Sequence, residues 1–297
     1  MRKTLRTLAL GLVAVVLLAG CGGAQLGTEN NPITWAFVPS GDTGTVTTGA
    51  EELAALLEDE TGLVFDILVT TENASAIEAM CSDPPEAQMS SLNTFSYVLA
   101  NERCGAETEL VAVRFGSASY NGQLIARADS GITGWGDLAG KTFCRADPLS
   151  TSSWIIPSLS MRAAGVDPDT GLAEIVDAGS HDAVVAAVYN GDCDAGATYV
   201  DARSTLEEEK ADVMDVLAVL ELTADIPNDG VQFIKGMDAE MKQTIVDALL
   251  AIAETEEGQE ALDTAYSWNA LEALGDDFYD PFRQVLQASG MNISDLQ

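Results

Sequence analysis

Residues 33–69 have the sequence ITWAFVPSGDTGTVTTGAEELAALLEDETGLVFDILV, which contains one complete strand–helix–strand pattern. Ile33–Val38 is an apolar run typical of a buried strand, and apolar residues alternate along Leu63–Val69, as in a second strand. Between them, Thr48 and Glu51 have the spacing of a capping box at a helix start. Apolar residues recur at helical spacing at Ala50, Leu53, Ala54 and Leu57. Two strands joined by a helix predict a parallel pair in one sheet.

Strands and helices continue to alternate along the chain, which is typical of an α/β protein. Further strands are predicted at 88–90, 110–115, 123–128, 141–144, 174–177, 195–198, 213–220 and 231–234. Further helices are predicted at 74–80, 94–100, 153–164, 182–190, 239–253, 258–267 and 276–288. We therefore expect mostly parallel sheets flanked by helices.

Two breaks in this alternation divide the chain. Residues 116–121 form a polar stretch between two predicted strands, and Ile226–Gly230 (IPNDG) has the composition of a turn. We interpret both as crossings between two lobes, with residues 33–117 and 229–297 in lobe I and residues 118–228 in lobe II. Two lobes joined by two crossings imply a hinge, with a ligand bound between the lobes.

The N-terminus has the composition of an export signal. Three basic residues precede an apolar run, Leu8–Leu18, that is too short to span a membrane as a helix. Leu18-Ala19-Gly20-Cys21 resembles the lipobox of bacterial lipoproteins, in which the cysteine becomes the lipid-modified first residue. We expect residues 1–21 to be a lipoprotein signal, Cys21 to anchor the chain to the membrane, and residues 22–32 to be a tether. Simple secretion with a chance cysteine is the alternative.

The chain is strongly acidic. Removing the three basic residues of the signal from the total of 14 leaves 11, against 47 acidic residues and hence a formal net charge of −36. Such a charge repels nucleic acid and anionic membrane surfaces, so both are excluded as partners. A solvated surface suited to solubility or to a salty habitat explains the acidity. The charge opposes anion binding unless local dipoles outweigh it.

Four cysteines remain in the mature chain, and an even number in an oxidising compartment suggests disulfides. Among the three possible pairings we favour Cys81–Cys104 and Cys144–Cys193, because each pair then lies within one predicted lobe. No pair has the CxxC spacing of a zinc site, and His181 is the only histidine. We therefore expect neither a metal site nor a cofactor.

Two predicted strand-to-helix junctions contain candidate ligand-binding residues. Asp147–Ser153 (DPLSTSS) is the first junction. A helix start leaves backbone N–H groups unpaired and carries a partial positive charge, so with neighbouring hydroxyls it suits a tetrahedral oxyanion. Gly179–Asp182 (GSHD) is the second, and if both face one cleft, His181 can donate to the same oxyanion and titrate near neutrality. Ordinary capping or packing is the alternative at both.

The order of four motifs resembles that of the phosphate, phosphite and phosphonate binding proteins of ABC transporters, over about residues 33–288. The motifs are DPLSTS (147–152), GSHD (179–182), GDCDAGATYVDAR (191–203) and IPND (226–229). The resemblance implies a two-lobed periplasmic-binding-protein-like fold. It also implies that the ligand oxygens are held by Ser150, Thr151, Ser152 and His181.

The resemblance implies roles for five further residues. Asp201 and Asp229 match acidic positions that hold the amino group of aminoalkylphosphonates, although a chance position near the cleft, or an Asx turn at Asp229, is an equal alternative. Tyr120 matches a cleft tyrosine after the first crossing. The family's tyrosine from lobe I is absent, because the corresponding turn has the sequence SSLNT (90–94). Either the ligand differs, or Asn93 and Thr94 replace that tyrosine.

Together these features predict an extracytoplasmic, monomeric substrate-binding lipoprotein that delivers a phosphonate-type oxyanion to an ABC permease. An aminoalkylphosphonate is the favoured ligand, and phosphite, methylphosphonate or phosphate is the alternative. A solute sensor lipoprotein would have the same sequence features. A serine hydrolase would place a serine, His181 and an acid in a triad, but the chain lacks a GxSxG motif, so we expect no enzyme activity.

Overall fold

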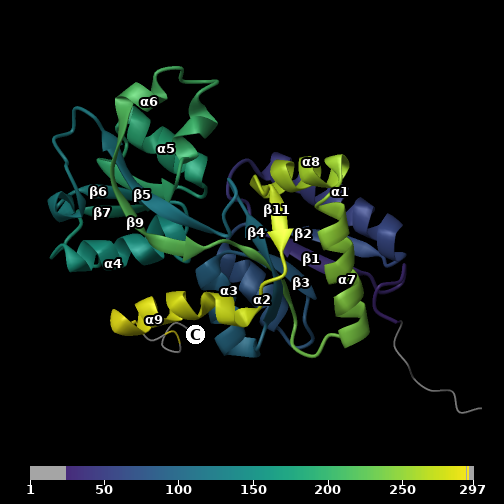
Figure 1. The fold of residues 1–297 in the computed structure, drawn as a ribbon. Coiled ribbons are helices and arrows are strands. Elements are labelled where there is room, and N and C mark those ends of the chain that lie inside the picture. Colours follow the sequence, from purple (N-terminus) through teal and green to yellow (C-terminus); the bar gives the residue numbers. More distant parts are fainter. Residues whose placement is uncertain (1–24, 292, 294–297) are drawn as a thin grey trace, which may run out of the picture.

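The computed structural model describes residues 25–291 and residue 293, which form two β-sheets flanked by helices (Figure 1). The first sheet has the strand order β11-β4-β10-β3-β1-β2 and the second has the order β7-β6-β8-β5-β9. The strands of the first sheet are β1 (Ile33–Phe37), β2 (Phe65–Val69), β3 (Met89–Leu92), β4 (Glu107–Val113), β10 (Gly230–Phe233) and β11 (Ala270–Glu272). Those of the second are β5 (Ser119–Arg127), β6 (Thr142–Arg145), β7 (Glu174–Asp177), β8 (Ala195–Tyr199) and β9 (Leu217–Pro227).

Helices connect most of these strands. The α-helices are α1 (Thr43–Thr61), α2 (Asn73–Cys81), α3 (Thr94–Cys104), α4 (Ile156–Ala163), α5 (His181–Asn190), α6 (Val213–Val216), α7 (Ala239–Ile252), α8 (Glu256–Tyr266) and α9 (Asp280–Ala288). A π-helical turn, Thr151–Ile155, leads directly into α4. Short 3₁₀ helices lie at Trp135–Leu138, Ala202–Leu206 and Asp276–Tyr279.

The α/β class is confirmed, and both sheets are mixed. β1 runs parallel to β2 and β3, and β6 runs parallel to β7 and β8, as the alternating pattern predicts. β10 is antiparallel to β3 and β4, and β5 is antiparallel to β8 and β9. These antiparallel strands flank the points where the chain passes from one sheet to the other, so no crossover helix sets their direction.

Two local predictions were wrong. The first helix begins at Thr43 rather than near Thr48, because the side chain of Asp42 caps it by accepting from the N–H of Thr45 at 2.9 Å. Thr48 lies inside the helix, where its hydroxyl donates to the Gly44 carbonyl, so the predicted capping box does not form. Residues 213–220, predicted as a strand, contain the helical turn α6 followed by the start of β9. The short strand β11 was not predicted.

The N-terminal predictions lie partly outside the described residues. The signal and Cys21 fall entirely outside them. Part of the predicted tether packs on the fold, since the Gly27 carbonyl accepts from the N–H of Val64 at 3.0 Å and residues 28 and 31 form a β-bridge. Within the part of the chain that the structure describes, no helix is both long enough and apolar enough to cross a membrane.

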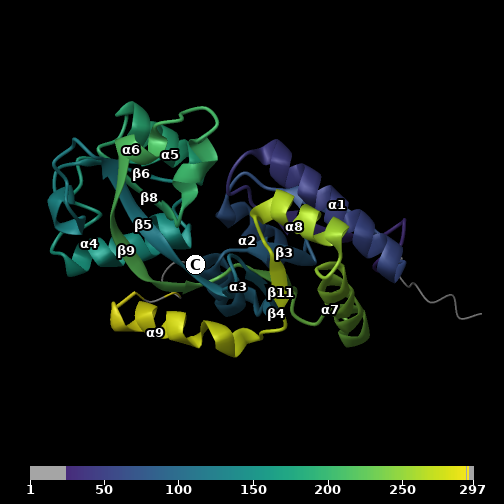
Figure 2. The same cartoon turned by 45° about the horizontal axis from the view of Figure 1, so that its top comes forward.

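Both predicted disulfides are confirmed: Cys81–Cys104 links α2 to α3, and Cys144–Cys193 links β6 to the segment before β8. The core contains three clusters. One packs the first sheet against α1, α7 and α8, and a second packs the second sheet against α5. The third contains residues of both sheets together with Phe282 and Leu286 of α9, which lies along both parts of the molecule (Figures 1 and 2).

The two crossings between the sheets are joined by hydrogen bonds. The first crossing is residues 114–118, between β4 and β5, and the second is residues 228–229, between β9 and β10. The side-chain amide of Asn228 donates to the carbonyls of Ala112 and Ser117 at 3.0 and 2.8 Å. Its backbone N–H donates to Ala118 at 2.8 Å. The crossings therefore form one unit, and the exact lobe boundaries stay a prediction.

Candidate functional site

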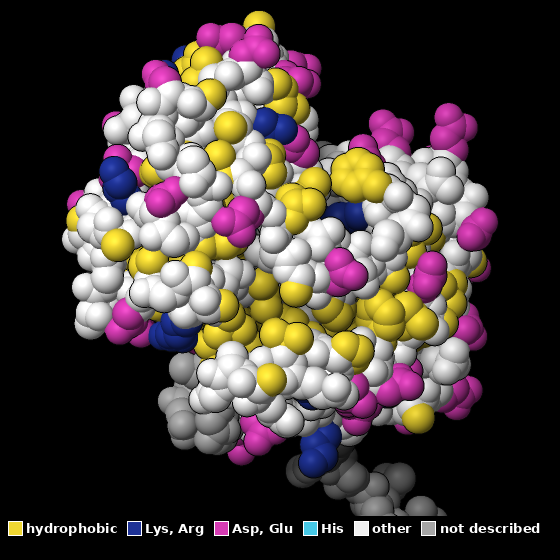
Figure 3. Space-filling model, turned by 60° about the vertical axis from the view of Figure 1, so that its left-hand side comes forward, with side chains coloured by type: hydrophobic (Ala, Val, Ile, Leu, Met, Phe, Trp, Pro, Cys, Tyr) yellow, Lys and Arg dark blue, Asp and Glu magenta, His cyan; other side chains and the backbone are white. Residues whose placement is uncertain are grey.

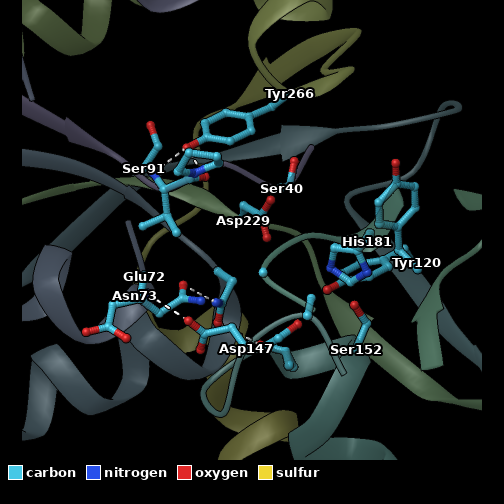
Figure 4. A pocket seen from close by; sticks show the side chains of 18 of the residues that line it. Ser40, Glu72, Asn73, Ser91, Tyr120, Asp147, Ser152, His181, Asp229 and Tyr266 are labelled. Atoms are coloured by element: carbon cyan, nitrogen blue, oxygen red, sulfur yellow. Dashed lines mark hydrogen bonds between the residues drawn. The ribbon is translucent and has the colours of Figure 1, made fainter. Parts of the chain in front are cut away.

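A cavity of about 60 Å³ lies between the two sheets, at the ends of their strands (Figure 4). Its walls come from the segments after β1, β2, β3, β6 and β7, from β5 and β8, from both crossings, and from α8. The carboxyl ends of neighbouring parallel strands meet at one edge of a sheet, so the loops and helix starts that follow them converge here. The polar and charged side chains of the wall are Ser40, Thr71, Glu72, Asn73, Ser91, Asn93, Arg114, Tyr120, Asp147, Ser150, Thr151, Ser152, His181, Tyr199, Asp229 and Tyr266.

The predicted serine motif lies on the cavity wall. Ser150 caps the helical segment by accepting from the N–H of Ser153 at 3.3 Å. The Ser153 hydroxyl accepts from Ala146 at 2.8 Å and donates to the Ala197 carbonyl at 2.6 Å, so it anchors the motif to the second sheet. Ser152 points into the cavity (Figure 4). The Ser150 cap uses the N–H of Ser153, so the N–H groups of Thr151 and Ser152 are those that a helix start leaves without a partner inside the helical segment.

Thr151 and Asp147 connect this motif to the first sheet's helices. The Thr151 hydroxyl donates to Asn93 at 2.8 Å and accepts from the N–H of Phe95 at 2.9 Å. The Asp147 carboxylate accepts from the N–H of Asn73 at 3.1 Å, at the start of α2. The cavity is therefore closed on this side by hydrogen bonds between its two walls.

Asn93 and Thr94 have different surroundings. Asn93 lines the cavity, but its side chain caps α3 through Ser96 at 3.0 Å and donates to Asn73 at 2.6 Å. Thr94 does not line the cavity; its buried hydroxyl donates to the carbonyl of Pro227 at 2.5 Å. Thr94 therefore ties α3 to the end of β9, and of these two residues only Asn93 lines the cavity.

His181 lies on the cavity wall at the start of α5. Its backbone N–H is already paired with the carbonyl of Ser40, at 3.1 Å, so this helix start offers fewer free donors than predicted. Its ring packs edge-on against Tyr199, and among the described residues Nδ1 has no hydrogen-bond partner. Burial, with the nearby charge of Arg114, lowers the pKa of His181 to about 3. The expectation that it titrates near neutrality was therefore wrong, and the imidazole is neutral at pH 7.

Arg114 is a cavity residue that the sequence analysis missed. It follows β4 at the first crossing, and its side chain is only 10% exposed. Nη2 lies 3.3 Å from Oδ2 of Asp229, while Nε has no hydrogen-bond partner among the residues described. A basic residue at the end of an apolar run, in a chain this acidic, was the signal available in the sequence. Tyr199 and Tyr266 were also missed, and no sequence pattern marked them.

The two predicted aspartates lie in different places. Asp229 lines the cavity and points into it (Figure 4), and burial raises its pKa although Arg114 lowers it in part. Asp201 lies outside this cavity and lines a neighbouring one. Its carboxylate accepts from Arg203 at 2.6 and 2.9 Å and from Gln123 at 3.0 Å. Asp229 and Asp201 therefore line adjacent cavities, which share Arg114, Tyr120, Tyr199 and Tyr266.

Tyr120 lies beside His181 and Ser152 (Figure 4). Burial, and then the charge of Asp229, raise the pKa of Tyr120, so its hydroxyl stays protonated and can donate. The described lining of the cavity therefore combines neutral donors, the cation of Arg114 and the carboxyl groups of Glu72, Asp147 and Asp229.

Local dipoles counter the acidity of the whole chain. Acidic side chains are spread over the face shown in Figure 3, and basic ones are few there. The starts of α2 and α5 and of the helical segment at Thr151 contribute residues to the cavity wall, and each start carries a partial positive charge. Surface carboxylates act through water and salt, whereas these dipoles act at contact distance. The site is therefore suited to a small oxyanion.

Residues 35–279 match the protein family described as "ABC transporter, phosphonate, periplasmic substrate-binding protein". The phosphate-import protein PhnD of Mycolicibacterium smegmatis is 31% identical to the chain over 206 residues. The matched region covers 64% of the chain and 64% of PhnD, so the chain spans less than two thirds of the length of this relative.

Two solved structures share the fold. One is a binding protein component of an ABC phosphonate transporter from Pseudomonas aeruginosa, with a TM-score of 0.78 and 21% identity, covering 87% of this chain and 86% of that one. The other is PhnD1 from Prochlorococcus marinus in complex with methylphosphonate, with a TM-score of 0.76 and 13% identity, covering 88% and 98%. Because the family match extends over most of the residues that build the two sheets, the chain belongs to the family of periplasmic substrate-binding proteins of ABC phosphonate transporters.

Proposed function

We propose that this protein captures a small phosphorus oxyanion in the cavity between its sheets and delivers it to an ABC permease. The observation that carries the proposal is the unpaired Nε of Arg114, a buried cation on a wall that also contains three helix starts. Arg114 contacts Asp229 at 3.3 Å, but a guanidinium has five N–H donors, and a buried donor without a partner is costly, which favours a ligand at this position. Membership of a family of periplasmic phosphonate-binding proteins supports the same role.

The size of the cavity favours a compact ligand. One ordered water needs roughly 10–15 Å³ of such a volume. A cavity of about 60 Å³ therefore holds only a few waters, which is comparable to the oxygens of one tetrahedral anion. Phosphate, phosphite and methylphosphonate are of this size.

The contact between Arg114 and Asp229 favours a ligand without an ammonium group. Asp229 is compensated in part by Arg114, and Asp201 is paired with Arg203 outside the cavity. An aminoalkylphosphonate is the second candidate, since Asp229 points into the cavity. The names of two similar proteins, a phosphate importer and a methylphosphonate complex, support the simpler ligands.

The alternatives differ in what they require. A hydrolase triad needs an acid on one ring nitrogen of His181 and a serine on the other, and within residues 25–291 the imidazole Nδ1 has no partner. The family is one of transport proteins rather than of enzymes. A solute sensor would use the same cavity, and it differs only in the membrane partner.

Titration calorimetry tests the ligand. The chain from Gly22 onward would be titrated with phosphate, phosphite, methylphosphonate, 2-aminoethylphosphonate and sulfate. We expect one binding site per chain and the tightest binding for a phosphorus oxyanion that lacks an amine. Failure to bind any of the four phosphorus compounds would refute the proposed function.

We further propose that a lipid on Cys21 holds the protein at the outer face of the membrane. Expression of the full chain in a bacterium fed a labelled fatty acid tests this. The wild-type protein should incorporate label and sediment with membranes, and Cys21→Ala should do neither. Label retained by Cys21→Ala would contradict the anchor.

A further inference from the structure

We propose that Arg114 and Asp229 together select ligands that carry one hydroxyl proton. Arg114 donates to an ionised oxygen of the ligand, and the Asp229 carboxylate accepts the hydrogen of a hydroxyl on the same ligand. The cavity thereby accepts hydrogen phosphate and protonated phosphonates and rejects sulfate, which has no proton at neutral pH. This proposal rests on the proposed function, because it requires an oxyanion in this cavity.

The backbone around the pair is fixed by the two crossings. The carbonyl of Asp229 accepts from the N–H of Ala112 at 2.9 Å. Arg114 exchanges backbone hydrogen bonds with Ser117 at 2.9 and 3.0 Å, and the next residue, Phe115, donates to Asn269 at 2.7 Å. The two side chains are therefore held at the junction of the sheets, where a bound ligand contacts both walls.

The pair leaves hydrogen-bonding capacity for a ligand. A guanidinium has five N–H donors and a carboxylate has about four acceptor positions. The ion-pair contact between Arg114 and Asp229 is long, at 3.3 Å, and Nε of Arg114 has no hydrogen-bond partner in the described part of the chain. Both side chains are mostly buried, with exposures of 10% and 17%, so bulk water satisfies little of this capacity. A ligand that both donates and accepts hydrogen bonds would pair with the unused donors of Arg114 and the unused acceptor positions of Asp229.

A carboxylate on the wall of an anion-binding cavity is favourable only if the ligand donates a hydrogen bond to it. An ionised carboxylate is an acceptor only, so a proton-free anion beside it is repelled. A ligand hydroxyl converts this repulsion into a charge-assisted hydrogen bond. An ammonium is less suitable, because it would lie beside the guanidinium of Arg114.

Other titratable groups face the pair from each neighbouring element. His181 of α5 is neutral at pH 7. Burial raises the pKa values of Tyr120 of β5, Tyr199 of β8 and Tyr266 of α8, so these groups stay protonated. Glu72 and Asp147 also lie on the wall, and Asp147 is paired with the N–H of Asn73. Of these three acids, Asp229 is the one for which the structure gives a direct contact with Arg114.

Calorimetric titration of wild-type protein and Asp229→Asn with phosphate and with sulfate tests the selection. We expect the wild type to prefer phosphate by about 100-fold or more, since a site that hydrogen-bonds a hydroxyl strongly rejects an analogue without one. Asn both donates and accepts, so the preference should fall by at least about 10-fold. Asp129→Asn is the matched control, because it removes the same charge from an exposed pair with Arg127. Thermal unfolding checks that each variant folds.

A second measurement varies the proton on the ligand. Methylphosphonate loses its last hydroxyl proton as the pH rises through its second ionisation, whereas hydrogen phosphate keeps one proton over the same range. Wild-type affinity for methylphosphonate should therefore fall with rising pH while affinity for phosphate does not. In Asp229→Asn this difference should disappear.

The outcomes separate the two proposals. A wild-type protein that binds no phosphorus oxyanion refutes the proposed function. A wild-type protein that binds phosphate while Asp229→Asn keeps the full preference over sulfate refutes the role of Asp229 and leaves the proposed function intact. Equal affinity of the wild type for sulfate and phosphate also refutes the inference.

Discussion

Asp201 and Asp229 each pair with an arginine, but the two pairs differ in geometry and in surroundings. Asp201 contacts Arg203, two residues away, through two hydrogen bonds of 2.6 and 2.9 Å, and it also caps the 3₁₀ helix that follows. Asp229 contacts Arg114 once, at 3.3 Å, across 115 residues. The first pair is saturated by its own neighbours. The second keeps unused donors and acceptors beside a cavity, which is why we assign ligand binding to it alone.

The largest expected effect is on ligand affinity in Arg114→Ala. Truncating one partner of a buried charge pair costs about 2–5 kcal/mol of binding free energy, so the dissociation constant should rise by roughly 30-fold or more. Arg203→Ala removes the partner of the saturated pair and should leave affinity nearly unchanged. Calorimetry with phosphate measures both variants. If Arg114→Ala and Arg203→Ala lost the same affinity, the proposed difference between the Arg114–Asp229 and Arg203–Asp201 pairs would be wrong.

The next effect concerns the pH dependence of stability and arises from His181, whose pKa is lowered by burial and by the charge of Arg114. An unfolded histidine binds a proton below about pH 6.5, whereas His181 in the folded chain does so only near pH 3. The unfolded state therefore gains protons first, and stability falls as the pH decreases through this window. Between pH 6.5 and 5 the loss attributable to His181 is about 2 kcal/mol.

Urea unfolding of wild type and His181→Gln at several pH values measures this loss. The variant lacks the titrating group, so its free energy of unfolding should decline less over the same interval. Parallel curves for the two proteins would contradict a buried, neutral imidazole.

The serine motif contains a similar contrast: the Ser152 hydroxyl faces the cavity, whereas the Ser153 hydroxyl is bonded to two backbone groups. Ser152→Ala removes a hydroxyl that faces the cavity, and the expected cost is about 1.5–3 kcal/mol of binding to a charged ligand. Ser153→Ala leaves Ala146 and Ala197 without their partner, so we expect about 1–3 kcal/mol of lost stability instead. Calorimetry and thermal unfolding of both variants distinguish the two roles. A Ser153→Ala protein that is fully stable but binds weakly would reverse the assignment.

The smallest expected effect is in Asp201→Asn. Its ion pair is partly exposed and lies outside the cavity, so stability should change by less than about 1 kcal/mol and phosphate affinity by less than about twofold. Selective loss of 2-aminoethylphosphonate binding in this variant would instead support an amine-binding role for Asp201.

Much of the fold was predictable because its signals are local. The alternation of strands and helices, the α/β class and both disulfides follow from patterns within the chain, and the structure agrees with them. Antiparallel β10 and the missed β11 were less predictable, because strand direction and pairing depend on where the chain returns in space. The start of the first helix was misplaced because Asp42 and Thr48 are both plausible caps in sequence.

The candidate site likewise has residues that the sequence predicts and residues that only the tertiary structure identifies. Ser150, Thr151, Ser152 and His181 lie at strand-to-helix junctions that sequence alone identifies, and all four reach one cavity. Their chemistry is determined by residue type: hydroxyls, helix-start N–H groups and an imidazole are oxyanion donors in any such junction.

Only the tertiary structure decided which charges matter at the site. It placed Arg114 beside Asp229, moved Asp201 to another cavity, and buried His181 so that its pKa falls far below neutrality. Charge–charge interactions and desolvation depend on distance and burial in three dimensions rather than on separation along the chain. The sequence by itself therefore determined the class of fold and the candidate donors of the cavity wall, whereas tertiary packing set the charge balance on which the proposed ligand selection depends.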